Sequence, residues 1–101
     1  MKRISILGST GSIGLQALEV ADDINSGIEV VGLSCKSNTK IFENQIRKYK
    51  PEIACIVDAS KYSDLKIRVS DTPTKIVCGE EGLIDVCHYH FRGASGLTVC
   101  T

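Results

Sequence analysis

Short apolar runs alternate with stretches of helical periodicity along most of this chain. Four runs rich in β-branched residues, at 3–7, 28–33, 53–57 and 74–78, are expected to be strands. Between and after these runs, apolar residues recur at the helical period, and helices are expected over 13–21, 39–49, 61–69 and 80–87. The second helix should bury one face, formed by Ile41, Phe42, Ile46 and Tyr49.

Nearly continuous apolar strands separated by helices are typical of a parallel sheet covered on both faces. Right-handed crossovers would then give a Rossmann-like, doubly wound α/β domain over residues 1–101. Residues 87–92 contain two histidines and an arginine and make a poor buried strand. The sheet is therefore expected to be incomplete at its C-terminal edge.

The sequence "ILGSTGSIG", residues 6–14, lies where the first strand should end and the first helix should begin. In such a turn one glycine permits a sharp reversal, another lets a pyrophosphate approach the backbone, and the third lets helix and strand pack closely. We therefore expect this turn to bind phosphate, with backbone amides and side-chain hydroxyls as the hydrogen-bond donors. The residues of the expected site are Gly8, Ser9, Thr10, Gly11, Ser12 and Gly14. The alternative is an ordinary turn in which Ser12 caps the helix.

The second strand ends in "LSCKSN", which contains no acid to accept the ribose 2′-hydroxyl of NAD. Lys36 is its only charge, flanked by Ser34, Ser37 and Asn38. An ammonium group with hydroxyl and amide donors suits a 2′-phosphate, which a carboxylate would repel. NADP(H) is therefore the predicted nucleotide. The alternative makes Lys36 a solvated surface lysine, and Asn38 can cap the following helix on either interpretation.

Composition and charge narrow the class of protein. Twelve basic and twelve acidic residues leave no formal net charge, which argues against broad binding to nucleic acid or an anionic membrane. No apolar run is long enough for a signal peptide or a membrane span, so a cytoplasmic location is expected. Five cysteines at irregular spacing are typical of a reducing compartment. Cys87, His88, His90 and Cys100 lack the spacing of a zinc module, so no metal site is predicted there.

Three stretches in order, "ILGSTGSIG", "VVGLSCKSN" followed by "QIRKYKP", and "TKIVCGEEGL", resemble the N-terminal region of the 1-deoxy-D-xylulose 5-phosphate reductoisomerase family. The resemblance covers residues 2–86, with a looser match at "GASGL". It implies that Thr10, Gly11, Ser12 and Ile13 bind the phosphates and adenosine side of NADPH. It also implies that Lys36, Ser37 and Asn38 surround the 2′-phosphate.

The same resemblance implies an enzyme of non-mevalonate isoprenoid biosynthesis. Such enzymes rearrange 1-deoxy-D-xylulose 5-phosphate and reduce the product with NADPH to 2-C-methyl-D-erythritol 4-phosphate. They use a divalent metal, Mg²⁺ or Mn²⁺, and the full-length family is expected to form homodimers. Members are several times longer than 101 residues, and the parts that hold the metal and the sugar phosphate lie beyond the matching region.

This chain is therefore expected to contain no catalytic residue and no metal ligand, and to be inactive alone as a fragment. Three acids, Glu80, Glu81 and Asp85, are expected on a solvated helix face. Two alternatives remain at this point. One is a fragment of another NADP-dependent dehydrogenase with a G-x-x-G-x-x-G turn, and the other is a non-catalytic nucleotide-binding module.

Overall fold

The computed structural model describes residues 2–23, 27–89 and 96–99 as an α/β domain. The strands are β1 (Lys2–Leu7), β2 (Ile28–Cys35), β3 (Ile53–Ile56), β4 (Lys75–Cys78) and β5 (Gly96–Val99). The helices are α1 (Ser12–Asp22), α2 (Thr39–Tyr49), α3 (Tyr62–Arg68) and α4 (Gly79–Tyr89), with a 3₁₀ turn, η1 (Ala59–Lys61), before α3. Every helix and every strand predicted from the periodicity is present, with ends that differ by at most two residues.

All neighbouring strands pair in parallel, in the order β4-β3-β2-β1-β5. The chain moves outward from β1 to β4 and then returns through α4 to add β5 on the other side of β1. This reversal makes the carboxyl end of β1 the topological switch point, which is where ligands bind in open α/β sheets. The predicted doubly wound parallel sheet is confirmed.

Strand β5 was not predicted. The prediction that the sheet is incomplete at this edge is wrong, because Gly96–Val99 pair in register with Arg3–Ile6 of β1. Of the predicted weak segment 87–92, residues 87–89 form the end of α4, and 90–92 lie outside the described residues.

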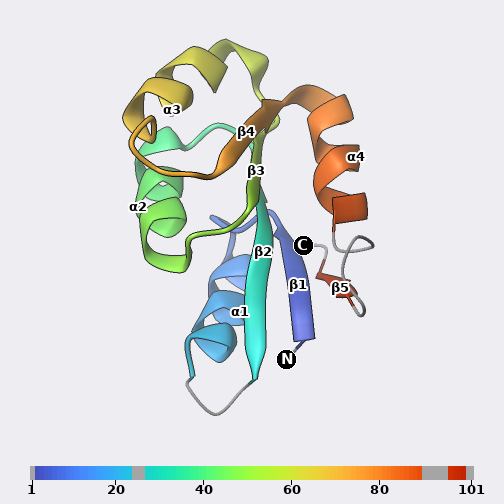
Figure 1. The fold of residues 1–101 in the computed structure, drawn as a ribbon. Helices are drawn as coiled ribbons and strands as arrows, with labels where there is room; N and C mark the ends of the chain where they lie inside the picture. The colour runs from blue at the N-terminus through green and yellow to red at the C-terminus, as the bar shows by residue number, and fades with distance from the viewer. Residues whose placement is uncertain (1, 24–26, 90–95, 100–101) are drawn as a thin grey trace.

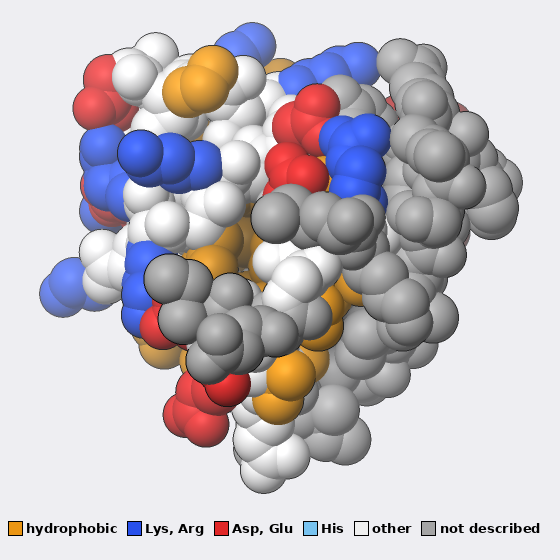
Figure 2. Space-filling model, turned by 60° about the horizontal axis from the view of Figure 1, so that its bottom comes forward, with side chains coloured by type: hydrophobic (Ala, Val, Ile, Leu, Met, Phe, Trp, Pro, Cys, Tyr) orange, Lys and Arg blue, Asp and Glu red, His pale blue; other side chains and the backbone are white. Residues whose placement is uncertain are grey.

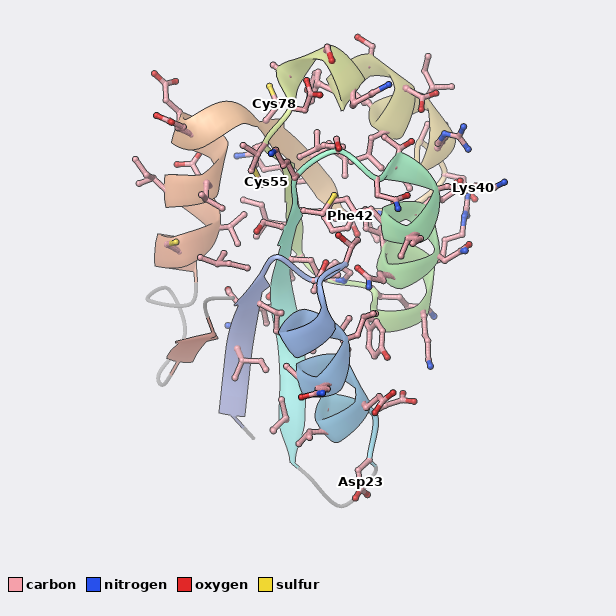
Figure 3. All side chains as sticks on the ribbon, turned by 180° about the vertical axis from the view of Figure 1, so that it is seen from behind. Asp23, Lys40, Phe42, Cys55 and Cys78 are labelled. Carbon is pink, nitrogen blue, oxygen red and sulfur yellow. The ribbon has the colours of Figure 1, made fainter. Side chains whose placement is uncertain are left out.

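Helices cover both faces of the sheet, with α1, α2 and α3 on one face and α4 on the other (Figure 1). The larger core lies on the first face, where alternate strand residues such as Ile6 and Leu33 meet Phe42 and Ile46 of α2. Figure 3 shows Phe42 directed from α2 towards the sheet and Lys40 directed away from it. Ile41, predicted to be buried, is 42% exposed, because the buried face of α2 contains Gln45 instead.

Helix α4 packs closely on the second face, because small residues line the contact. A Cβ at Gly82 would lie 3.0 Å from both Cys55 Sγ and a methyl of Val77. A Cβ at Gly32 of β2 would lie 2.6 Å from Ser5 Oγ and 3.0 Å from Val86. The acids of α4, Glu80, Glu81 and Asp85, are exposed as predicted. None of the helices in the described ranges has the length and apolar character that crossing a membrane requires.

We expect the fold to lose stability between pH 9 and pH 12 because of two buried thiols. Burial raises the pKa of Cys35 and of Cys55 from 9.0 to about 12. The unfolded chain therefore releases the thiol protons at a lower pH than the native chain does. The contribution of the two thiols to stability is complete below pH 9 and disappears as pH rises through 12. The midpoint of urea unfolding should fall across this range. A chain with both cysteines replaced by alanine should show a shallower fall, and an unchanged slope would contradict the assignment.

Candidate nucleotide-binding site

The glycine-rich turn lies between β1 and α1, at the carboxyl edge of the sheet. Gly8 has a φ of 73°, a left-handed conformation that favours glycine, and this starts the reversal. The amide of Gly11 then donates to the carbonyl of Gly8 at 3.0 Å, and the amide of Leu15 donates to the carbonyl of Gly11 at 2.9 Å. Helix α1 therefore begins at Ser12 with Gly11 as its N-cap. The alternative in which Ser12 is the cap is wrong.

Gly14 lies where the first turn of α1 passes directly over the glycine turn. A Cβ at this position would lie 2.2 Å from the carbonyl oxygen of Gly8 and 2.7 Å from the Cα of Ser9. Both neighbours are backbone atoms, so there is no side chain that could move aside. The close packing expected from the third glycine is therefore present, and it places the start of α1 against the end of β1.

The first turn of α1 offers backbone donors at this edge. An α-helix leaves its first amides without an acceptor inside the helix, which here are those of residues 12–14. Gly11 has no side chain to cap them, and no acid occupies the first turn. The helix dipole adds partial positive charge at the same place. The arrangement suits an anion, as the motif predicts.

The turn is tied to the end of β2 by Ser34. The amide of Gly8 donates to Ser34 Oγ at 3.1 Å, and the amide of Ser9 donates to the Ser34 carbonyl at 2.7 Å. Ser34 is 2% exposed. The expectation that Ser34 is a phosphate donor beside Lys36 is therefore wrong, because its side chain faces the glycine turn from within the sheet.

Ser9 also differs from its predicted role. It is fully buried, its hydroxyl donates to Gln45 Oε1 at 2.6 Å, and Gln45 Nε2 donates back to the Ser9 carbonyl at 2.8 Å. The Ser9 hydroxyl therefore binds a side chain of α2 and is not one of the phosphate donors of the turn. Gln45 was missed in the sequence analysis, although a polar residue between Phe42 and Ile46 on the apolar face of α2 is a usable signal. Thr10, on the other hand, is half-buried at the turn.

Lys36, Ser37 and Asn38 connect β2 to α2, and all three are exposed. Asn38 caps α2, with its Oδ1 accepting from the amide of Ile41 at 3.2 Å, as expected. The carbonyl of Ser37 accepts from the amide of Thr39 at 2.9 Å. Because β1 and β2 are parallel neighbours, this segment and the glycine turn lie at the same edge of the sheet.

An acid from the next strand also reaches this edge. The amide of Asp58 donates to the carbonyl of Lys36 at 2.8 Å, which places the end of β3 beside the Lys36 segment. The amide and hydroxyl of Ser60 both donate to Asp58 Oδ1, at 3.0 and 2.6 Å. These hydrogen bonds lower the pKa of the Asp58 carboxyl, and the positive charges of Lys61 and Lys36 act in the same direction. The prediction of the 2′-phosphate site rests on residues at the end of β2 and does not include this carboxylate.

We expect replacement of Asn38 by alanine to lower the free energy of unfolding by about 1 kcal/mol, because the cap of α2 is lost. Urea denaturation measures this directly. Asn44, exposed in the middle of the same helix, provides the matched control. Asn44→Ala should be neutral or slightly stabilising, since alanine is the better helix former. Equal losses in the two variants would contradict the capping role.

Other chemistry is sparse in the described ranges. No group of three His, Cys, Asp or Glu side chains there could hold a metal ion. Of the Cys87, His88, His90 and Cys100 segment, His90 and Cys100 lie outside the described residues. On the face drawn in Figure 2, Lys and Arg side chains are mixed with Asp and Glu side chains. The glycine turn and the Lys36 segment at the sheet edge therefore remain the candidate site.

Comparisons with known proteins agree on one family. The family model described as 1-deoxy-D-xylulose 5-phosphate reductoisomerase matches residues 4–94. The chain is 46% identical over 92 residues to a 1-deoxy-D-xylulose 5-phosphate reductoisomerase of Microcystis aeruginosa, a match that covers 88% of this chain and 23% of the relative. It is 46% identical over 84 residues to one of Lachnoclostridium phytofermentans, covering 83% and 21%. The chain thus spans less than a quarter of the length of these relatives.

Solved structures give the same answer. A DOX-P reductoisomerase crystallised with NADPH, fosmidomycin and magnesium superposes with a TM-score of 0.86 at 25% identity, covering 97% of this chain and 24% of that one. The enzyme of Zymomonas mobilis in complex with NADPH gives a TM-score of 0.79 at 26% identity, covering 84% and 22%.

Proposed function

The chain belongs to the 1-deoxy-D-xylulose 5-phosphate reductoisomerase family, and from this premise we propose that residues 1–101 are an NADPH-binding domain. The observation that carries the proposal is the turn between β1 and α1. Its left-handed Gly8, its sterically required Gly14 and its uncapped helix start together form a backbone cradle for a pyrophosphate. Family membership also disfavours a fragment of an unrelated dehydrogenase.

In this proposal the pyrophosphate lies against the backbone of Gly8, Thr10, Gly11, Ser12, Ile13 and Gly14. The 2′-phosphate lies at the exposed segment formed by Lys36, Ser37 and Asn38, one strand away on the same edge. The Lys36 ammonium supplies the charge, and Asn38 contributes while its Oδ1 caps α2. When bound, the nicotinamide of NADPH supplies a hydride.

The whole enzyme, by this proposal, rearranges and reduces 1-deoxy-D-xylulose 5-phosphate to 2-C-methyl-D-erythritol 4-phosphate, with a divalent metal and as a homodimer. The residues described here would bind and orient the cofactor. The ligands of Mg²⁺ or Mn²⁺, the sugar-phosphate site and the catalytic residues would lie in the part of the family that extends beyond this match. We therefore expect no turnover from the 101-residue chain alone.

Titration followed by two-dimensional NMR tests the proposed site. Adding NADPH to the ¹⁵N-labelled chain should shift the amide signals of residues 10–14 and 36–38 most strongly. Amides at the amino ends of the strands, such as that of Ile53, should stay in place. Shifts confined to another surface would contradict the proposal.

A further inference from the structure

One pair of buried polar side chains joins two parts of the proposed cofactor site. Ser9, in the glycine turn, and Gln45, on α2, exchange two hydrogen bonds of 2.6 and 2.8 Å across 36 residues of sequence. We refer to these two residues as the Ser9–Gln45 pair. Ser9 is 0% exposed and Gln45 is 6% exposed. The pair is therefore shielded from water and joins the turn to α2 directly.

Packing alone does not explain a glutamine at this position. Its neighbours on the buried face of α2, Phe42 and Ile46, are fully buried and apolar. A buried amide needs partners for its donor and its acceptor, and here the carbonyl and hydroxyl of Ser9 supply both. The amide fixes the position of α2 relative to the glycine turn, because both hydrogen bonds form only in one arrangement of the two segments.

The two ends of the pair belong to the two phosphate subsites. Ser9 lies between Gly8 and Thr10, inside the turn proposed to hold the pyrophosphate. Gln45 lies on the helix whose N-terminus is capped by Asn38, in the segment proposed to hold the 2′-phosphate. Ser34 fixes the turn to the strand, whereas the Ser9–Gln45 pair fixes it to the helix.

We propose that Gln45 is a positioning residue for NADPH, which acts through Ser9 to set the separation between the pyrophosphate-binding turn and the 2′-phosphate subsite at the start of α2. This inference rests on the proposed function. Gln45 itself does not touch the cofactor. Its effect should appear only for ligands that occupy both subsites, because such ligands need the turn and the helix in register.

The test compares two ligands on the same variant. NADPH carries both the pyrophosphate and the 2′-phosphate, whereas adenosine 2′-monophosphate carries only the latter. Gln45→Met keeps the length of the side chain and removes both hydrogen bonds. We expect it to weaken NADPH binding about tenfold, within the usual range for coupling between two sites. Binding of adenosine 2′-monophosphate should change less than twofold, on the same reasoning.

Ile46→Val is the matched control. It removes one methyl-sized group from the neighbouring buried position of α2 and leaves both groups of the Ser9–Gln45 hydrogen bonds unchanged. It should lower stability while leaving the affinity ratio of the two ligands unchanged.

Ser9→Ala serves as the second variant, because it removes the hydroxyl bond and keeps the bond from Gln45 to the Ser9 carbonyl. Its NADPH affinity should fall about threefold, in proportion to the one bond lost, and it decides the matter if Gln45→Met does not fold.

The outcomes separate the two proposals. If the unaltered chain binds neither ligand, the proposed function fails and this inference fails with it. If the unaltered chain binds NADPH and Gln45→Met binds it equally well, the function stands and the positioning role is wrong. The positioning role is also overturned if Gln45→Met weakens both ligands equally, or if Ile46→Val changes the ratio as much.

Discussion

Replacing Gly14 by alanine should destabilise the fold by about 3 kcal/mol or more, because the added methyl group would meet backbone atoms and could not be accommodated by a side-chain movement. The new Cβ would lie 2.2 Å from the Gly8 carbonyl oxygen and 2.7 Å from the Ser9 Cα. Relief requires α1 to move away from the end of β1. Urea denaturation followed by circular dichroism measures the loss.

Gly11→Ala is the control in the same turn. A Cβ there would lie 3.4 Å from the same carbonyl oxygen, an ordinary contact, and φ at Gly11 is −83°. Its cost should stay below about 1 kcal/mol, the amount by which alanine is a poorer N-cap than glycine. Similar losses for the two variants would contradict the assignment of close packing to the third glycine of the motif.

Reversing the charge of Lys36 should reduce the preference of the chain for NADPH over NADH by about 100-fold. A charge-assisted hydrogen bond to the 2′-phosphate is worth about 1.5–3 kcal/mol, and Lys36→Glu replaces it with repulsion. NADH, which has a hydroxyl in place of the phosphate, should bind with nearly unchanged affinity. Fluorescence titration with the two dinucleotides measures the ratio.

Lys40→Glu makes the same change of charge on the outer side of α2, where Lys40 points away from the sheet (Figure 3). A general electrostatic effect would act on both variants, whereas direct contact with the phosphate involves Lys36 alone. The preference should therefore change by less than about threefold in Lys40→Glu, as for an exposed charge screened by salt. Equal changes in the two variants would contradict a 2′-phosphate subsite at Lys36.

The sequence predicted the order of elements because local signals agree with the tertiary structure. The β1–α1 turn, for example, contains glycines at the two positions where the backbone needs them, Gly8 for its φ and Gly14 for its close packing. Strand β5 was not predicted because it is short and follows the polar segment 87–92. Its pairing with β1 joins residues far apart in the sequence, which local patterns do not reveal. Ile41 was misplaced because helical periodicity alone could not show that Gln45 takes the buried position.

Side-chain roles at the site were predicted less well than backbone roles. Ser9 in the glycine turn, and Ser34 and Asn38 near the end of β2, are all small polar residues. The sequence does not show which way each side chain points. The first two face inward and bind Gln45 and the glycine turn, whereas Asn38 caps α2. Asp58 joins the edge only because β3 is the next strand in the sheet. Such contacts depend on strand order and register, which a single sequence does not specify.

Calorimetric titration of the 101-residue chain with NADPH and with NADH, at the same salt concentration, tests the central claim most directly. The account predicts that NADPH binds to one site per chain and that NADH binds at least tenfold more weakly, given one charge-assisted contact to the 2′-phosphate. Absence of NADPH binding by a folded chain, or equal affinity for the two dinucleotides, would contradict it.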